Sequence, residues 1–183
     1  MSKPKLSILF VTAEVDPYAT KAGLAQVAGS LPQAIKSLAH DDLGIDIRVI
    51  MPKYSNKELR NLEEVEPFHT VISRLRVPFG NQEFDVAVQR DDRYGVTTYL
   101  VDNDEFFGCD ARIYWPPETP RPDCAIEIPN IKRFAFFSQA VLEIVKRLQF
   151  RPHVIHCNDW HTALILVYLW TLYGNDHFFR DPN

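Results

Sequence analysis

Residues 6–12 read Leu-Ser-Ile-Leu-Phe-Val-Thr, a nearly continuous apolar run. Such a run is typical of a strand that is buried on both faces of a parallel sheet. A second β-branched run extends from Asp46 to Met51 and is closed by Pro52. The residues between the two runs have helical periodicity, so residues 6–52 predict a strand, a loop, a helix and a second strand. This order is typical of the opening unit of a Rossmann-like fold.

The predicted helix follows a loop at residues 13–22 that contains the breaker Pro17. Its apolar residues recur three or four positions apart and form one face of a helix: Leu24, Val27, Leu31, Ile35 and Leu38. Pro32 lies inside this pattern. Because proline lacks a backbone N–H and its ring clashes with the preceding turn, we expect Pro32 to kink or split the helix.

The rest of the chain continues the α/β pattern after an interruption. Residues 71–101 contain short β-rich runs separated by turns at 80–81 and 91–95, which predict hairpins that extend one edge of the sheet. Residues 106–129 are rich in proline and predict a long loop. An amphipathic helix over 134–148, a buried strand over 153–157 and an apolar helix over 160–173 are predicted to follow. We therefore predict a three-layer α/β domain with a mostly parallel sheet and a hairpin extension.

The composition indicates one soluble, globular domain. The 183 residues are 46% apolar and 24% charged, which is typical of a single folded domain. The net charge of −4 argues against an electrostatic nucleic-acid binder, and the apolar runs fall short of the about 20 residues that span a membrane. The three cysteines form no C-x-x-C pair and no secretory signal is visible, so we expect a cytoplasmic protein with reduced thiols.

Two loops follow predicted parallel strands, at the edge where ligands bind in open α/β sheets. In the loop at residues 14–23, Lys21 supplies positive charge and Gly23 lets the backbone approach a ligand closely. The helix behind this loop presents free N–H groups, which is how a helix N-terminus holds a phosphate. The alternative is an ordinary strand-to-helix turn with a solvated lysine.

The second loop is Asn158-Asp159-Trp160-His161. The Asp159 carboxylate is suited to accept hydrogen bonds from sugar hydroxyls, and Trp160 offers an apolar face to a sugar ring. The alternative is that Asp159 caps the helix that follows while Trp160 packs in the core. The residues alone do not decide between the two. We expect no metal here, since strand alternation puts His156 and the cysteine after it on opposite faces.

Both loops carry motifs that resemble those of a known family. Residues 13–17 read Ala-Glu-Val-Asp-Pro, residues 21–27 read Lys-Ala-Gly-Leu-Ala-Gln-Val, and residues 154–163 read Val-Ile-His-Cys-Asn-Asp-Trp-His-Thr-Ala. These stretches resemble the S/A-E-x-x-P, K-T-G-G-L-A-D-V and D-W-H motifs of bacterial glycogen synthases and plant starch synthases. The resemblance extends over essentially the whole chain, in order and at similar spacing.

The resemblance implies a GT-B glycosyltransferase, in which two Rossmann-like domains face each other across a cleft. That family transfers glucose from ADP-glucose or UDP-glucose to the end of an α-1,4-glucan with retention of configuration, and it uses no metal or cofactor. By resemblance, residues 1–183 are its N-terminal, acceptor-side catalytic domain. We expect the C-terminal nucleotide-sugar domain to be absent and the isolated chain to be inactive.

An alternative of a different class is a non-catalytic module that binds α-glucan or a synthase. By resemblance, the expected partners are α-glucan and a nucleotide-sugar, and neither nucleic acid nor a membrane is expected. An incomplete sheet leaves an exposed edge, which predicts self-association.

The resemblance also implies roles for residues in both loops. Asp159 matches a catalytic aspartate that contacts substrate in the cleft, while Lys21 and Gly23 lie on the donor-phosphate side. The sugar and acceptor side is assigned to Tyr114, Asn158, Trp160 and His161.

The sequence departs from the family pattern at several of these positions. The family's phosphate-binding lysine falls on Thr20, with Lys21 one position later, and its first glycine is Ala22. Further departures are Gln26, Cys109 and Pro129. Ala22 carries a β-carbon where a glycine permits close approach or a positive φ. These differences predict weaker binding of the diphosphate than in the family.

Overall fold

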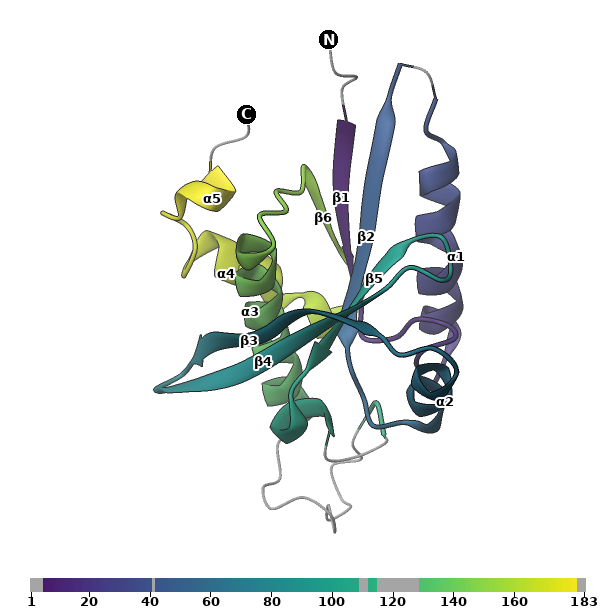
Figure 1. The fold of residues 1–183 in the computed structure, drawn as a ribbon. Coiled ribbons are helices and arrows are strands. Elements are labelled where there is room, and N and C mark those ends of the chain that lie inside the picture. The colour runs from purple at the N-terminus through teal and green to yellow at the C-terminus, as the bar shows by residue number, and fades with distance from the viewer. Residues whose placement is uncertain (1–4, 41, 109–111, 115–128, 181–183) are drawn as a thin grey trace.

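The computed structural model describes residues 5–40, 42–108, 112–114 and 129–180. Within these residues, the strands form one sheet in the order β3-β4-β5-β2-β1-β6 (Figure 1). They are β1 (Lys5–Val11), β2 (Gly44–Pro52), β3 (His69–Phe79), β4 (Gln82–Asp91), β5 (Thr97–Asp102) and β6 (Val154–Cys157). Strands β5, β2, β1 and β6 run parallel, and β3 and β4 add an antiparallel hairpin at one edge. The predicted α/β fold with a mostly parallel sheet and a hairpin extension is confirmed.

Helices cover both faces of this sheet, so the molecule has the predicted three layers (Figure 1). The helices α1 (Gly23–Ser37) and α2 (Lys57–Val65) lie on one side of the parallel strands. The helices α3 (Asn130–Arg147) and α4 (Leu164–Trp170) lie on the other side, and the short α5 (His177–Arg180) follows α4. Strands covered on both faces are apolar throughout. In β1, accordingly, Leu9, Phe10 and Val11 have no exposed surface.

Pro32 does not split α1. The helix runs without interruption from Gly23 to Ser37, so the predicted split is wrong. The proline removes one backbone donor from the helix, but Pro32 is buried. Its packing in the interior offsets the lost hydrogen bond.

The remaining helical predictions need two corrections. The apolar helix predicted over 160–173 is shorter than expected, since a 3-10 turn at Trp160–Thr162 precedes α4. Helix α2 has no counterpart in the sequence prediction, because Leu59 is its only buried residue. The loop predicted over 106–129 begins with a π-helical turn at Asp104–Gly108, and most of its remaining residues lie outside the described ranges.

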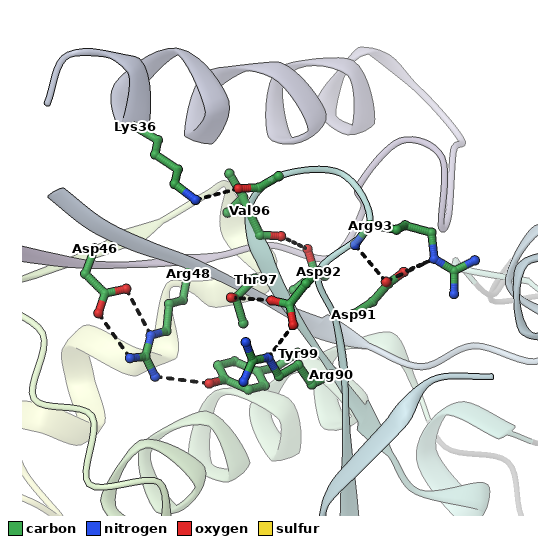
Figure 2. A network of polar contacts seen from close by, with 12 residues as sticks. Lys36, Asp46, Arg48, Arg90, Asp91, Asp92, Arg93, Val96, Thr97 and Tyr99 are labelled. Carbon is green, nitrogen blue, oxygen red and sulfur yellow. Dashed lines mark hydrogen bonds and ion pairs between the residues drawn. The ribbon is translucent and has the colours of Figure 1, made fainter. Parts of the chain in front are cut away.

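A network of polar contacts joins α1, β2 and the turn between β4 and β5 (Figure 2). The Arg48 guanidinium donates to both carboxylate oxygens of Asp46 at 3.1 Å and to the Tyr99 hydroxyl at 3.1 Å. The Lys36 ammonium, in the last turn of α1, donates to the Gly95 carbonyl at 2.6 Å. These contacts tie the C-terminal end of α1 to the sheet, so that its N-terminal end has a defined position at the opposite edge.

Candidate functional site

The two loops singled out in the sequence lie side by side. They follow β1 and β6, which are neighbouring parallel strands, and Val11 pairs with Cys157 at their ends. The Asn158 N–H donates to the Val11 carbonyl at 2.9 Å, and the Asn158 side-chain amide donates to the Thr12 hydroxyl at 3.4 Å. Residues 14–23 and 158–161 therefore share one edge of the sheet, where ligands bind in open α/β folds.

Glu14 links the first of these loops to Tyr114, and sequence reasoning did not assign it a role. Its side chain is only 1% exposed. One carboxylate oxygen, Oε2, accepts from the backbone N–H groups of Lys21 at 2.7 Å and Ala22 at 3.1 Å. The other oxygen, Oε1, accepts from the Tyr114 hydroxyl. The signal available in the sequence was an acidic residue directly after a buried strand, within the E-x-x-P motif.

The start of α1 has open N–H groups. Ala22 has φ −146° and ψ −171°, an extended backbone that any residue adopts, so its β-carbon causes no strain. Within the described part of the chain, the N–H groups of Gly23 and Leu24 have no hydrogen-bond partner. A β-carbon added to Gly23 would meet no atom within 4 Å, so the space beside it is open. An anion placed here would receive two backbone hydrogen bonds and the favourable end of the helix dipole.

Lys21 is the cation available at this helix terminus. Its side chain is exposed, and it forms no ion pair with any described residue. Thr20, which stands at the position of the family's lysine, donates instead to the Asp16 carboxylate at 3.1 Å. Thr20 is therefore occupied within the loop, whereas the Lys21 ammonium is free to meet an anion.

The loop between β1 and α1 is held by buried hydrogen bonds to the rest of the domain. The Tyr54 hydroxyl donates to the Ala13 carbonyl at 3.0 Å, and the Asn56 side chain donates to the Tyr18 carbonyl at 2.9 Å. The Tyr18 hydroxyl donates to Asp91 at 2.9 Å. Asp91 is itself paired with Arg93 at 2.8 Å, as Figure 2 shows. A loop fixed in this way presents its backbone donors without a cost of ordering when a ligand arrives.

Asp159 has a strained backbone. Its φ of 68° and ψ of 178° fall in a region that glycine occupies far more readily than other residues and that costs on the order of 1–3 kcal/mol elsewhere. Its carboxylate accepts from the Trp160 N–H at 2.6 Å, so the predicted capping alternative is confirmed for Asp159. The predicted packing of Trp160 in the core is wrong, because half of that side chain is exposed. Such strain is concentrated at binding and catalytic sites.

His161 is enclosed by aromatic rings. It lies stacked on Tyr114 with centroids 5.0 Å apart, and it contacts Trp160 at 4.0 Å and Phe134 at 4.7 Å. Its Nδ1 atom is buried and has no hydrogen-bond partner among the described residues. Burial lowers the pKa of His161 below its ordinary value of 6.5, although the nearby Asp159 and Glu14 act in the opposite direction. The imidazole is therefore neutral at pH 7.

This lowered pKa predicts a pH dependence of stability. The folded protein resists protonation of His161 and the unfolded chain does not, so the contribution is complete above pH 6.5 and is lost as the pH falls below it. We expect His161→Gln to reduce the slope of unfolding free energy against pH between about pH 6.5 and 5, as measured by urea titrations at each pH. The exposed His69→Gln is the control, and equal slopes for His161→Gln and the wild type would contradict the prediction.

Arg133 positions the segment that carries Tyr114. Its side chain is 1% exposed, and it donates to the Phe106 carbonyl at 2.7 Å and to the Ile113 carbonyl at 3.0 Å. Since Ile113 precedes Tyr114, this buried guanidinium fixes the backbone from which the tyrosine reaches Glu14. Cys109, one of the departures from the family pattern, lies outside the described residues.

The structure thus brings together every residue that the sequence analysis assigned to the site. Lys21 and Gly23 lie on one side of Glu14, and Tyr114 lies on the other, against the loop of residues 158–161. Among the described residues there is no group of three or more metal-ligating side chains. No helix in the described ranges has both the length and the apolarity to span a membrane.

Known proteins resemble this chain over nearly its full length. A glycogen synthase from Desulforamulus reducens is 32% identical over 176 residues, which are 96% of this chain and 32% of that protein. Glycogen synthase 2 from Geobacter sulfurreducens is 39% identical over 175 residues, which are 95% of this chain and 33% of that protein. The chain therefore spans about a third of the length of the curated relatives it matches.

A solved structure shows the same fold. The catalytic domain of Starch Synthase IV from Arabidopsis thaliana, bound to ADP and acarbose, superposes with a TM-score of 0.71 at 21% identity. The superposition covers 92% of this chain and 31% of that one. The family model described as starch synthase catalytic domain matches residues 7–183. The chain belongs to the starch synthase catalytic domain family.

Proposed function

We propose that this chain forms the acceptor-side part of a site that transfers glucose from ADP-glucose to an α-1,4-glucan. The observation that carries the proposal is the Glu14 carboxylate, which joins the open N-terminus of α1 to Tyr114 and so to the D-W-H loop. On the side of α1, the Lys21 ammonium and the open backbone N–H groups can bind an anion. On the side of Tyr114, aromatic and polar side chains can bind a sugar.

The donor side is suited to stabilise a departing diphosphate. Lys21 supplies a full positive charge, and the N–H groups of Gly23 and Leu24 supply preorganised dipoles. Such groups stabilise the negative charge that develops on a leaving group, and they do so without reorganising during the reaction. The Arabidopsis thaliana relative binds ADP, which supports a nucleoside diphosphate as the ligand here.

The sugar side is suited to hold glucose units. The exposed half of Trp160 offers a ring face to the apolar side of a sugar. The Asp159 carboxylate, held by the Trp160 N–H, keeps lone pairs that can accept from sugar hydroxyls. We assign Asp159 the role of contacting the substrate at the reacting centre, and Asn158, Tyr114 and His161 the role of shaping the pocket around it.

We also propose that the 183-residue polypeptide alone has no measurable glucosyltransferase activity. The matched curated relatives are about three times as long as this chain. A site that is open on one side neither surrounds the donor nor excludes water, and exclusion of water is part of catalysis in such enzymes. Glucose transfer from ADP-glucose to maltotetraose by this polypeptide would overturn this part of the proposal.

Binding is tested by calorimetry with ADP and with maltotetraose. We expect both to bind, and we expect Lys21→Gln to weaken ADP binding by about tenfold, because one charge-assisted contact contributes about 1.4 kcal/mol. Arg147→Gln, which removes an exposed positive charge from the last turn of α3, is the control and leaves the ADP affinity unchanged. Unaltered affinity in Lys21→Gln removes the donor role of Lys21. Failure of the wild type to bind either ligand at millimolar concentration overturns the proposed function.

One observation favours the synthase-partner form of the second candidate, the non-catalytic module, and also the expected self-association. Helix α4 exposes apolar side chains, namely Leu166 at 61%, Val167 at 49% and Trp170 at 86% exposure. Strand β6 lies at the edge of the sheet and pairs only with β1 among the described strands. An open edge beside an apolar surface favours association. Sedimentation velocity tests self-association, and a monomer at high micromolar concentration would count against it.

A further inference from the structure

We propose that Glu14 is a positioning residue that couples the two sides of the site, so that a nucleoside diphosphate bound at the start of α1 strengthens the binding of the glucan end beside Tyr114. This inference rests on the proposed function for the identity of its ligands. Its structural part, the link from the start of α1 to Tyr114 through a single carboxylate, stands on the contacts of Glu14 alone.

The inference rests on the fact that the two carboxylate oxygens of Glu14 accept hydrogen bonds from different parts of the chain. Among the described residues, Oε2 accepts from the N–H groups of Lys21 and Ala22, and Oε1 accepts from the Tyr114 hydroxyl. The group is buried, so no water screens one oxygen from the other. A change in the hydrogen bonds at Oε2 therefore alters the electron density available at Oε1.

A diphosphate would make such a change. The N–H groups that hold Glu14 directly precede the open N–H groups of Gly23 and Leu24 at the same helix terminus. An anion bound to the open pair draws on the same positive end of the helix that stabilises Glu14. The hydrogen bonds from the Lys21 and Ala22 N–H groups to Oε2 therefore weaken. As a result, the carboxylate becomes a stronger acceptor for the donor at its other oxygen, Oε1.

The donor at Oε1 is Tyr114. Burial and the neighbouring Glu14 carboxylate raise the pKa of Tyr114 above its ordinary value, so the hydroxyl keeps its proton and donates it. A stronger hydrogen bond to Glu14 holds the Tyr114 ring more firmly against His161, on which it is stacked. The Tyr114 ring, which forms part of the sugar-binding side of the site, is thereby ordered before the glucan binds. Because coupling between two ligands is reciprocal, the glucan end strengthens diphosphate binding by the same factor.

The experiment measures the maltotetraose Kd of the full chain by calorimetry, with and without saturating ADP. We expect ADP to lower this Kd by about fivefold in the wild type, at the lower end of typical coupling. Tyr114→Phe keeps the ring and removes the hydroxyl, and we expect the two Kd values to become equal. Glu14→Gln is expected to do the same. Tyr168→Phe, which changes a tyrosine of α4, is the matched control and keeps the wild-type ratio.

A second readout needs no ligand. In nuclear magnetic resonance spectra, Tyr114→Phe should shift the backbone amide signals of Lys21 and Ala22, because it removes a hydrogen bond from the carboxylate that holds them. Unshifted signals overturn the link through Glu14. Wild-type binding of both ligands with a Kd ratio of one overturns the coupling and leaves the proposed function in place. If neither ligand binds, the proposed function fails and the coupling fails with it, while the amide shifts still decide whether the link exists.

Discussion

Replacing Arg133 with methionine is expected to lower the free energy of unfolding by on the order of 3 kcal/mol, because two buried carbonyl groups each lose a donor worth about 1–3 kcal/mol. The guanidinium is 1% exposed and donates to the Phe106 and Ile113 carbonyls at 2.7 and 3.0 Å. Methionine has a similar length and fills much of the space, so the loss reflects the hydrogen bonds more than a cavity. Urea unfolding followed by circular dichroism measures it.

A surface arginine is the matched control for this change. Arg74 pairs with Asp85 at 2.7 Å, and both side chains are more than half exposed. Exposed ion pairs contribute little to stability because water and salt screen them. We expect Arg74→Gln to leave the urea midpoint unchanged. A midpoint for Arg133→Met that matches the wild type would mean that the buried carbonyl groups find other donors.

Replacing Phe136 with alanine is expected to lower the free energy of unfolding by about 3–5 kcal/mol, the usual cost of emptying a buried aromatic position. Phe136 has no exposed surface. Its ring stacks on Phe106 at 3.9 Å and meets the edges of Phe79 and Phe84 at 5.6 and 5.5 Å. These contacts join α3 to the β3–β4 hairpin, so the cavity would form at the junction between the hairpin and the helix.

Urea unfolding measures this loss, and hydrogen exchange locates it. We expect the amides of β3 and β4 to exchange faster in Phe136→Ala than in the wild type, because the hairpin loses much of its packing partner. Ile131→Ala is the control on the same helix, since Ile131 is 75% exposed, and changes at exposed positions usually stay within about 0.5 kcal/mol. Similar midpoints for the two variants would show that the aromatic cluster does not stabilise the hairpin junction.

Part of the site could be predicted from nearby residues in the sequence, and part depends on contacts between distant residues. The D-W-H loop and the start of α1 were found because each follows a predicted strand, and the ends of parallel strands meet at one edge. Glu14 was missed because its partners lie 7, 8 and 100 residues further along the chain. No periodicity in the sequence reports a contact of that kind. Whether Asp159 caps the turn that follows it, and whether Trp160 packs in the core, likewise became clear only from the contacts and burial of each side chain.

The strands, the main helices and the parallel arrangement could be predicted from the order of residues, because hydrophobic periodicity and chain order are local properties that the fold must satisfy. Three features became visible only in the folded chain: α1 continues through Pro32, α2 forms around Leu59, and Glu14 links the loop after β1 to Tyr114. Each of these depends on burial or on a hydrogen bond to a distant part of the chain, and such energies exist only after the chain has folded.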